Sequence, residues 1–425
     1  MRPRVSLGAI FRFWVPIAAS WLMMAIEGPV VAAVIARLAD VKPNLAAFGV
    51  AFTFAIIVEA PVIMLLSAAT ALAANGPSYR RLRAFTHLLN GGVTVAMLIL
   101  LTPPVFALVF ERGIGLTEPV LGLTHRALAI LLPWPAVIGY RRFYQGIMIR
   151  RGRTGLAAAC TLVRLSTIVV ASVVLSRTSL PGALVGAAAL SSAVTLESIA
   201  AFLMARGVAR ETCAIAGEAP TFGAIGRFYT PLALTAFIGL VAQPVLTFFM
   251  NRSPHPLESL AVYPVIHSFT FLFRSMGLSY QEVAIALLAR GRYHRAGVRA
   301  FAWLLGAGSA LALAAVAYSP LAVVWYGKVA NLTPELLAFA IPATQALAVM
   351  PLLSVMLSYQ RALFVNVRRT APISWATVIE VAVVGGAMFA LVGRGDLSGV
   401  TAASLAILVG RVAANLYLEI PRRPR

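Results

Sequence analysis

Charged residues are scarce in this sequence. Asp, Glu, Lys and Arg make up 12% of the 425 residues, whereas a soluble globular protein carries about 25%. Hydrophobic residues reach 60%, and mean hydropathy is +0.88. These values exclude an ordinary soluble enzyme and a disordered chain. Because each membrane crossing needs about 20 apolar residues, the length leaves room for roughly twelve helices with short loops, and for no separate soluble catalytic domain.

The sequence also lacks the residue groups that catalysis or metal binding requires. There is no GxxxxGK[ST] loop, no HExxH or CxxC pattern and no GxSxG elbow, and the five histidines are scattered. The two cysteines, Cys160 and Cys213, fall in an apolar run and in a polar loop, so they predict no disulfide. We therefore expect no enzyme activity, no cofactor and no metal site.

Acidic residues are few beside basic ones, with 14 against 35, which gives a net charge of +21. In an apolar chain this excess indicates basic loops that face anionic lipid headgroups, rather than a nucleic-acid partner. High arginine and alanine use is typical of a bacterial source. We therefore expect an integral protein of a bacterial inner membrane, and a monomer.

Long apolar runs recur along the whole chain and must be helical, because lipid offers no partner for unpaired backbone groups. The twelve predicted runs are 11–35, 45–73, 85–110, 127–149, 155–176, 181–205, 228–250, 258–289, 299–326, 335–365, 370–392 and 397–420.

The loops between these runs predict their orientation. One set of alternate loops, together with both termini, carries 20 Lys and Arg residues, and the opposite set carries 8. The positive-inside rule places the richer set, and with it both termini, in the cytoplasm. An even number of crossings agrees with this.

The sequence repeats itself after 215 residues. Residues 13–72 align with residues 228–287 without a gap, and 13 of the 60 positions are identical. The most telling identities are Pro16/Pro231, Pro29/Pro244 and Arg37/Arg252. The repeat predicts a bundle of six helices over 1–205, a cytoplasmic linker over 206–227 and a second bundle over 228–425. We expect the bundles to be related by a two-fold axis along the membrane normal, with a substrate site between them.

Several charged residues lie deep within the predicted helices, where a charge costs at least ~2.5–3.5 kcal/mol on insertion scales. They are Glu27, Glu59, Arg164, Glu197, Arg274, Glu282, Glu380 and Arg411, while Arg141, Arg142 and Arg361 lie nearer the cytoplasmic ends. Such residues must face the bundle interior, either as ion pairs or as a site. At equivalent positions of the repeat, Glu59 aligns with Arg274. With a shift of one further residue, Arg164 aligns with Glu380.

The eighth run carries a polar stripe. His267, Arg274 and Gln281 are seven residues apart, a spacing that keeps them on one helix face. An arginine in a partly dry cavity is a strong donor to carboxylate or phosphate. We therefore predict substrate binding by this stripe, together with Arg141, Arg142 and Arg411. In the alternative, His267 packs in a core and Arg274 pairs with Glu59.

The acidic residues are candidates for coupling or gating. Glu27 stands before Gly28-Pro29, and a carboxylate beside a helix kink can take up a cation as a transporter cycles. We predict this role for Glu27, Glu59 and Glu380, with a proton or sodium as the coupling ion.

These features resemble a known superfamily. The segment from Phe13 through Pro16 to Arg37, followed by 45–49 (Leu-Ala-Ala-Phe-Gly), is similar to the first hairpin of the MATE multidrug exporters of the MOP superfamily. The segments 228–234 and 244–252, and Tyr263-Pro264-Val265-x-His267 followed by Arg274, resemble the progressive ankylosis (ANK) branch. The latter resemblance implies export of small organic anions such as citrate, nucleotides or pyrophosphate, with Glu27, His267 and Arg274 in the cavity.

The sequence therefore predicts an all-α membrane protein of the MOP type, which exports a small organic anion by rocker-switch alternating access. The alternatives are a MATE-like exporter of cationic drugs, a flippase for lipid-linked oligosaccharides, and a membrane scaffold in which every buried charge is paired.

Overall fold

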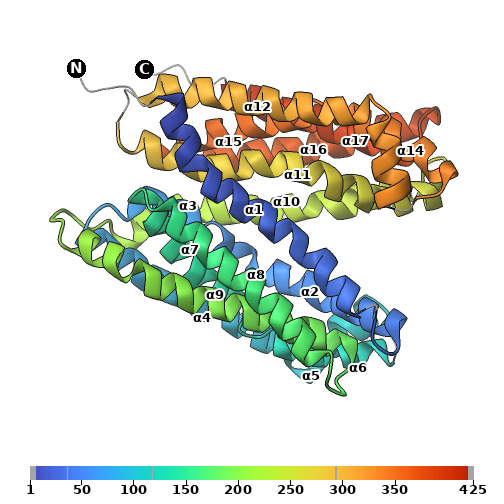
Figure 1. The fold of residues 1–425 in the computed structure, drawn as a ribbon, viewed down its shortest axis with the longest axis horizontal. Coiled ribbons are helices and arrows are strands. Elements are labelled where there is room, and N and C mark those ends of the chain that lie inside the picture. Colours follow the sequence, from blue (N-terminus) through green and yellow to red (C-terminus); the bar gives the residue numbers. More distant parts are fainter. Residues whose placement is uncertain (1–5, 36, 117, 292–293, 331, 420–425) are drawn as a thin grey trace. The chain divides into compact units, whose positions relative to one another are not determined.

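The computed structural model describes residues 6–35, 37–116, 118–291, 294–330 and 332–419, and within these ranges every regular element is a helix (Figure 1). The terminal arginines used to predict the orientation, at positions 2, 4, 422, 423 and 425, lie outside the described residues. The placement of the termini in the cytoplasm therefore stays a prediction.

The chain forms two compact units. The N-unit comprises Ala19–Tyr229, and the C-unit comprises Met1–Ala18 with Thr230–Arg425. Two long helices pass from one unit to the other: α1 (Leu7–Ile35) after Ala18, and α10 (Phe222–Met250) after Tyr229. The predicted division at 206–227 lies close to the second of these points. The division into bundles over 1–205 and 228–425 with a cytoplasmic linker stays a prediction.

The two units have nearly the same order of elements (Figure 1). The N-unit contains α2 (Val41–Ile63), α3 (Leu65–Leu72), α4 (Gly76–Leu101), α5 (Pro103–Phe106), the π-helix η1 (Ala107–Gly113), α6 (Val120–Ile130), α7 (Trp134–Arg150), α8 (Thr154–Leu175) and α9 (Gly182–Cys213). The C-unit contains α11 (Pro256–Leu288), α12 (Arg295–Ala317), α13 (Leu321–Val323), the π-helix η3 (Val324–Val329), α14 (Pro334–Ala346), α15 (Met350–Asn366), α16 (Ala371–Arg394) and α17 (Gly399–Glu419). In this order, α2 and α3 of the N-unit stand in the place of the single helix α11 of the C-unit.

The irregular segments of the two units also correspond. In each unit a short helix and a π-helix follow a proline, and the chain then closes on a buried aromatic residue. The Leu116 amide donates to the Phe110 carbonyl at 2.9 Å, and the Leu332 amide donates to the Tyr326 carbonyl at 2.8 Å. Because these positions are 216 residues apart, the repeat seen in the sequence extends to local backbone geometry.

Most of the predicted runs are long and apolar enough to cross a membrane. Over the described residues there are ten such spans, and the pair α14–α15, bent by 41°, makes an eleventh. The helix α11 corresponds to the remaining run and is 33 residues long. Its sequence carries Arg274, Gln281 and Glu282.

Close helix contacts in the N-unit depend on small residues. Gly146 on α7 faces α3 so closely that a Cβ atom would lie 2.6 Å from the Ala69 Cβ and 2.7 Å from the Leu66 carbonyl oxygen. Gly155, by contrast, is exposed on α8 and has no other atom within 4 Å of such a Cβ.

We expect the substitution Gly146→Ala to destabilise the protein by about 1–3 kcal/mol, because α3 and α7 would have to separate. The matched change Gly155→Ala is expected to be neutral or slightly stabilising, because alanine favours a helix. Thermal unfolding in detergent would measure both variants. Equal midpoints would contradict the close packing of these two helices.

Candidate functional site

The buried polar cluster of the N-unit is centred on Glu197, whose side chain on α9 is 0% exposed. The Arg141 Nη1 atom lies 2.7 Å from one carboxylate oxygen, and the Arg164 Nη1 atom lies 3.4 Å from the same oxygen. Gln145 and Thr161 donate to the other oxygen at 3.3 and 3.5 Å. Three helices, α7, α8 and α9, are therefore joined through one carboxylate.

Arg164 connects this centre to two further carboxylates. Its Nη2 atom makes a short ion pair with Glu27 on α1. Its guanidinium carbon lies 5.5 Å from the centre of the Trp134 ring, a distance typical of cation–π contact. The Trp134 indole in turn donates to a Glu59 carboxylate oxygen at 2.8 Å. The chain from Glu197 to Glu59 is therefore continuous through the interior of the N-unit.

Cations and anions balance in this cluster. Three guanidinium groups stand beside its three carboxylates: Arg141 and Arg164 make ion pairs, and Arg142, which lies 5.8 Å from the centre of the Trp21 ring, interacts electrostatically with Glu59. Burial of charge is tolerated when partners and hydrogen bonds compensate for lost hydration. The N-unit cluster therefore needs no bound ion to balance its formal charge.

The polar cluster of the C-unit is built from α15, α16 and α17. The Arg411 Nε and Nη2 atoms lie 2.9 and 2.8 Å from one oxygen of Glu380. A third nitrogen of Arg411 lies 3.5 Å from the Ser354 hydroxyl. Arg361 donates to the Thr377 hydroxyl at 3.2 Å. The Glu380 carboxylate therefore pairs with Arg411 and also interacts electrostatically with Arg361.

Arg274 on α11 is a third guanidinium in the same region, close enough to interact electrostatically with Arg411 and Glu380. Across the described ranges no residue gives Arg274 a hydrogen bond or an ion pair, and its Nε atom is buried. Arg274, Arg361 and Arg411 against Glu380 give a formal charge of +2. Chemically, this arrangement can hold an anion, because guanidinium groups match carboxylate and phosphate geometry.

The remaining members of the predicted stripe lie along α11. The His267 ring is 5.9 Å from the Tyr263 ring, and the Tyr263 hydroxyl lies 3.3 Å from the Gln243 side-chain oxygen. Gln281 follows Arg274 by two turns on the same helix and takes part in further interactions.

The predicted residues thus divide between the units. Arg141, Arg142, Glu27 and Glu59 belong to the N-unit cluster, whereas Arg274, Arg411 and Glu380 come together in the C-unit. The binding and coupling roles given to them stay predictions. Within the described part of the chain, no group of His, Cys, Asp and Glu residues is placed to hold a metal ion.

Several residues of the clusters were not predicted as site residues, among them Glu197, Arg164, Arg361 and Trp134. Glu197 and Arg164 were recognised as deep charges, and Arg361 as a charge near a helix end. Arg361 directly follows Tyr359-Gln360, a pair that repeats Tyr144-Gln145 in the first half of the chain, and this repeat is a signal for it. No sequence pattern marked Trp134 as a site residue beyond its place after Pro133. Its part in the cluster is a hydrogen bond to Glu59, which lies on a helix distant in the sequence.

Comparison with solved structures reveals the fold. No family model matches the chain, and no curated protein matches it. A MOP superfamily transporter from Pyrococcus furiosus, described as having a binding pocket of reverse polarity that suggests a different function, is 16% identical. The match covers 99% of this chain and 96% of that one, with a TM-score of 0.81.

Two further solved structures are of MATE transporters. An outward-facing multidrug resistance MATE transporter of the MOP superfamily is 17% identical over 96% of this chain and 93% of that one, with a TM-score of 0.72. A mutant of the Vibrio cholerae MATE transporter VcmN is 14% identical over 97% of this chain and 95% of that one, with a TM-score of 0.77. The predicted all-α fold of the MOP and MATE type is therefore confirmed, whereas the ANK branch stays a prediction.

Proposed function

We propose that the chain is a secondary transporter that moves a small organic anion across the membrane by alternating access. The fold supports transport, since the matching solved structures include transporters. The main observation in favour of an anionic substrate is the formal charge of +2 on the group formed by Arg274, Arg361, Arg411 and Glu380. A cation at membrane depth costs at least ~2.5–3.5 kcal/mol, and a bound anion offsets that cost.

The N-unit cluster supports a separate role in coupling. One carboxylate oxygen of Glu27 accepts from Arg164, while the other is buried and has no partner among the residues described. An oxygen of this kind can take up a proton or a small cation, which would weaken the pair with Arg164. In the proposed cycle the C-unit cluster binds the anion and Glu27 responds to the coupling ion.

Uptake by proteoliposomes tests this function. We expect saturable uptake of labelled citrate or labelled ATP by the reconstituted protein, changed in rate by an imposed pH gradient, and no saturable uptake of a cationic dye. Liposomes without protein provide the background. Saturable uptake of the dye alone would contradict the proposal.

The buried acidic oxygen of Glu27 also favours the second candidate, a MATE-like exporter of cationic drugs. In that case the carboxylates would bind substrate, and dye uptake would depend on Glu27 or Glu59. The balanced charge of the N-unit cluster speaks against this role, because Arg141 and Arg164 already pair with two of its three carboxylates, those of Glu197 and Glu27. If neither the anions nor the dye moved, a lipid-linked substrate would be the next candidate.

A further inference from the structure

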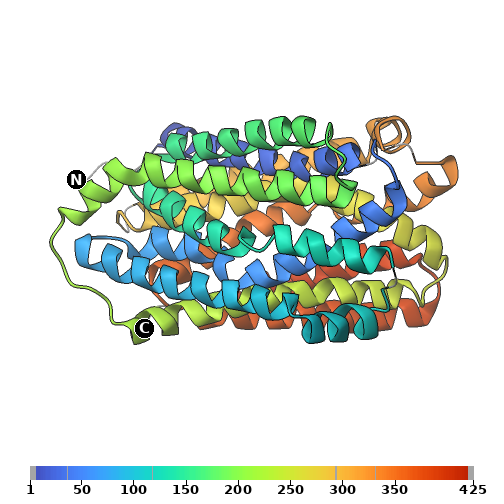
Figure 2. The same ribbon diagram turned by 90° about the horizontal axis from the view of Figure 1, so that it is seen from below.

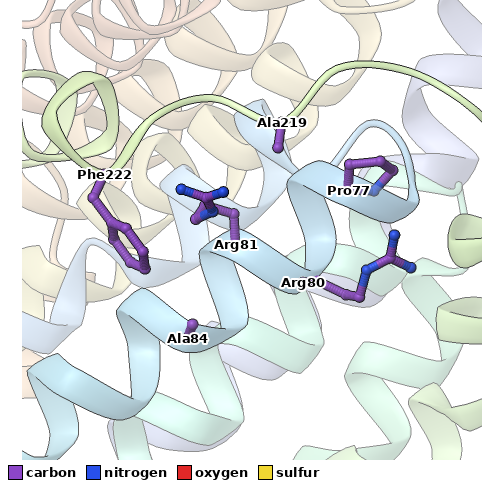
Figure 3. Close-up of a pocket in the computed structure, with 6 residues that line it drawn as sticks. All are labelled: Pro77, Arg80, Arg81, Ala84, Ala219 and Phe222. Atoms are coloured by element: carbon purple, nitrogen blue, oxygen red, sulfur yellow. The ribbon is translucent and has the colours of Figure 1, made fainter.

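A basic pocket opens at the start of α4, away from both clusters (Figure 3). Four of its residues, Pro77, Arg80, Arg81 and Ala84, lie on one face of α4 at helical spacing. The opposite wall is formed by Ala219, which lies just before α10, and by Phe222, the first residue of α10. The pocket has a volume of about 570 Å³.

The wall opposite α4 includes part of the segment 214–221, which joins α9 to α10 and which Figure 2 shows as a loop without regular structure. Hydrogen bonds to the start of α4 hold this segment in place. The Gly76 amide donates to the Ile215 carbonyl at 3.0 Å, and the Asn75 side chain donates to the Glu218 carbonyl at 3.4 Å. A Cβ atom on Gly76 would lie 2.5 Å from the Cys213 carbonyl oxygen. The pocket is therefore a built feature of the N-unit.

The two arginines of the pocket carry charge that no described residue neutralises. The Arg81 guanidinium carbon lies 5.0 Å from the centre of the Phe222 ring, which fixes its position beside the loop, as Figure 3 shows. Arg80 is exposed. Across the described ranges neither residue has a hydrogen bond or an ion pair, and no carboxylate lines the pocket.

We propose that this pocket binds the phosphate of an anionic phospholipid headgroup. Guanidinium groups match phosphate oxygens in geometry and charge. The pocket lies at the Gly76 end of the apolar span Gly76–Leu101, and thus at the depth where headgroups meet a membrane protein. Pro77, Ala84 and Phe222 add an apolar wall for the glycerol and upper acyl carbons. Basic pockets beside membrane helices recognise lipid headgroups in this way.

Native mass spectrometry of the full chain tests the site. Phosphatidylglycerol or phosphatidylcholine would be added to the detergent-solubilised protein, and retained lipid would be counted. The double variant Arg80→Gln/Arg81→Gln is expected to retain phosphatidylglycerol about tenfold less well than the unchanged protein, because two charge-assisted contacts are lost. Retention of phosphatidylcholine is expected to be unchanged.

The variant Arg83→Gln is the matched control. Arg83 is exposed on the same turn of α4 but lies over Tyr79, at 5.7 Å from its ring centre, and does not line the pocket. We expect it to retain phosphatidylglycerol as the unchanged protein does. Equal losses in Arg83→Gln and in the double variant would overturn the proposal, because they would indicate general surface charge.

Two further arms separate the source of the phosphate and any effect on folding. Inorganic phosphate is expected to displace phosphatidylglycerol only weakly. Full displacement by inorganic phosphate at concentrations equal to the lipid would overturn the lipid as ligand. If the double variant fails to fold, Arg80→Gln alone serves, because Arg80 is exposed and no described residue depends on it. Unchanged lipid retention in that variant would also overturn the proposal.

Discussion

Replacement of Glu197 by alanine is expected to cost the protein about 3–5 kcal/mol of stability, the largest loss expected of any single change proposed for this chain. The side chain of Glu197 is fully buried and receives Arg141, Arg164, Gln145 and Thr161. Its removal leaves Arg141 buried without a carboxylate partner among the described residues. Arg164 keeps its ion pair with Glu27, so the loss of stability comes mainly from the unpaired charge of Arg141.

Thermal unfolding in detergent measures this loss, and Glu211→Ala is the control. Glu211 pairs with Arg153 at 3.8 Å, and both side chains are more than half exposed. We expect that exposed pair to contribute at most about 1 kcal/mol. The double variant Arg141→Met/Glu197→Leu should recover part of the stability, because it removes both charges together. A Glu197→Ala protein as stable as Glu211→Ala would show that the cluster does not stabilise the N-unit.

The substitution Arg274→Gln is expected to reduce anion uptake by at least about 30-fold and leave folding intact, because a lost charged contact in a binding site costs about 2–5 kcal/mol. Arg274 has no ion pair with any described residue, so its removal leaves no buried carboxylate without a partner. Uptake of labelled citrate or ATP, together with thermal unfolding, would measure both effects.

Two neighbouring arginines provide the comparison for this result. Arg411→Gln would leave Glu380 without its ion pair, so we expect lost stability as well as lost uptake. Arg252→Gln is the neutral control, since Arg252 is exposed and stacks on Phe248, with 3.7 Å from its guanidinium carbon to the ring centre. Normal uptake by folded Arg274→Gln protein would remove Arg274 from the binding site.

The helical runs, the repeat and the burial of most charges within the helices could be predicted from the sequence. Apolar runs of this length have only one stable backbone arrangement in lipid, so their number and order follow directly. The repeat likewise predicted that the two units share nearly the same order of elements. The π-helices η1 and η3 could not be predicted, because they depend on one shifted backbone hydrogen bond rather than on a residue pattern.

The partners of the charged residues could not be predicted, because spacing along one helix does not reveal which helices face each other. Alignment of the repeat placed Arg164 opposite Glu380 as an equivalent. In the structure each pairs within its own unit, Arg164 with Glu27 and Glu197, and Glu380 with Arg411. The prediction of Arg274 as a cavity residue depended on the seven-residue stripe, and its proximity to Arg411 and Glu380 came only from the fold.

The most direct test of anion transport compares citrate and cationic-dye uptake in one set of proteoliposomes, carrying unchanged protein, Arg274→Gln or Arg252→Gln. We expect saturable citrate uptake with unchanged protein and with Arg252→Gln, almost none with Arg274→Gln, and no saturable dye uptake with any of the three. Saturable dye uptake, unaffected by Arg274→Gln and lost when Glu27 is changed to Gln, would contradict anion transport and favour a cationic substrate.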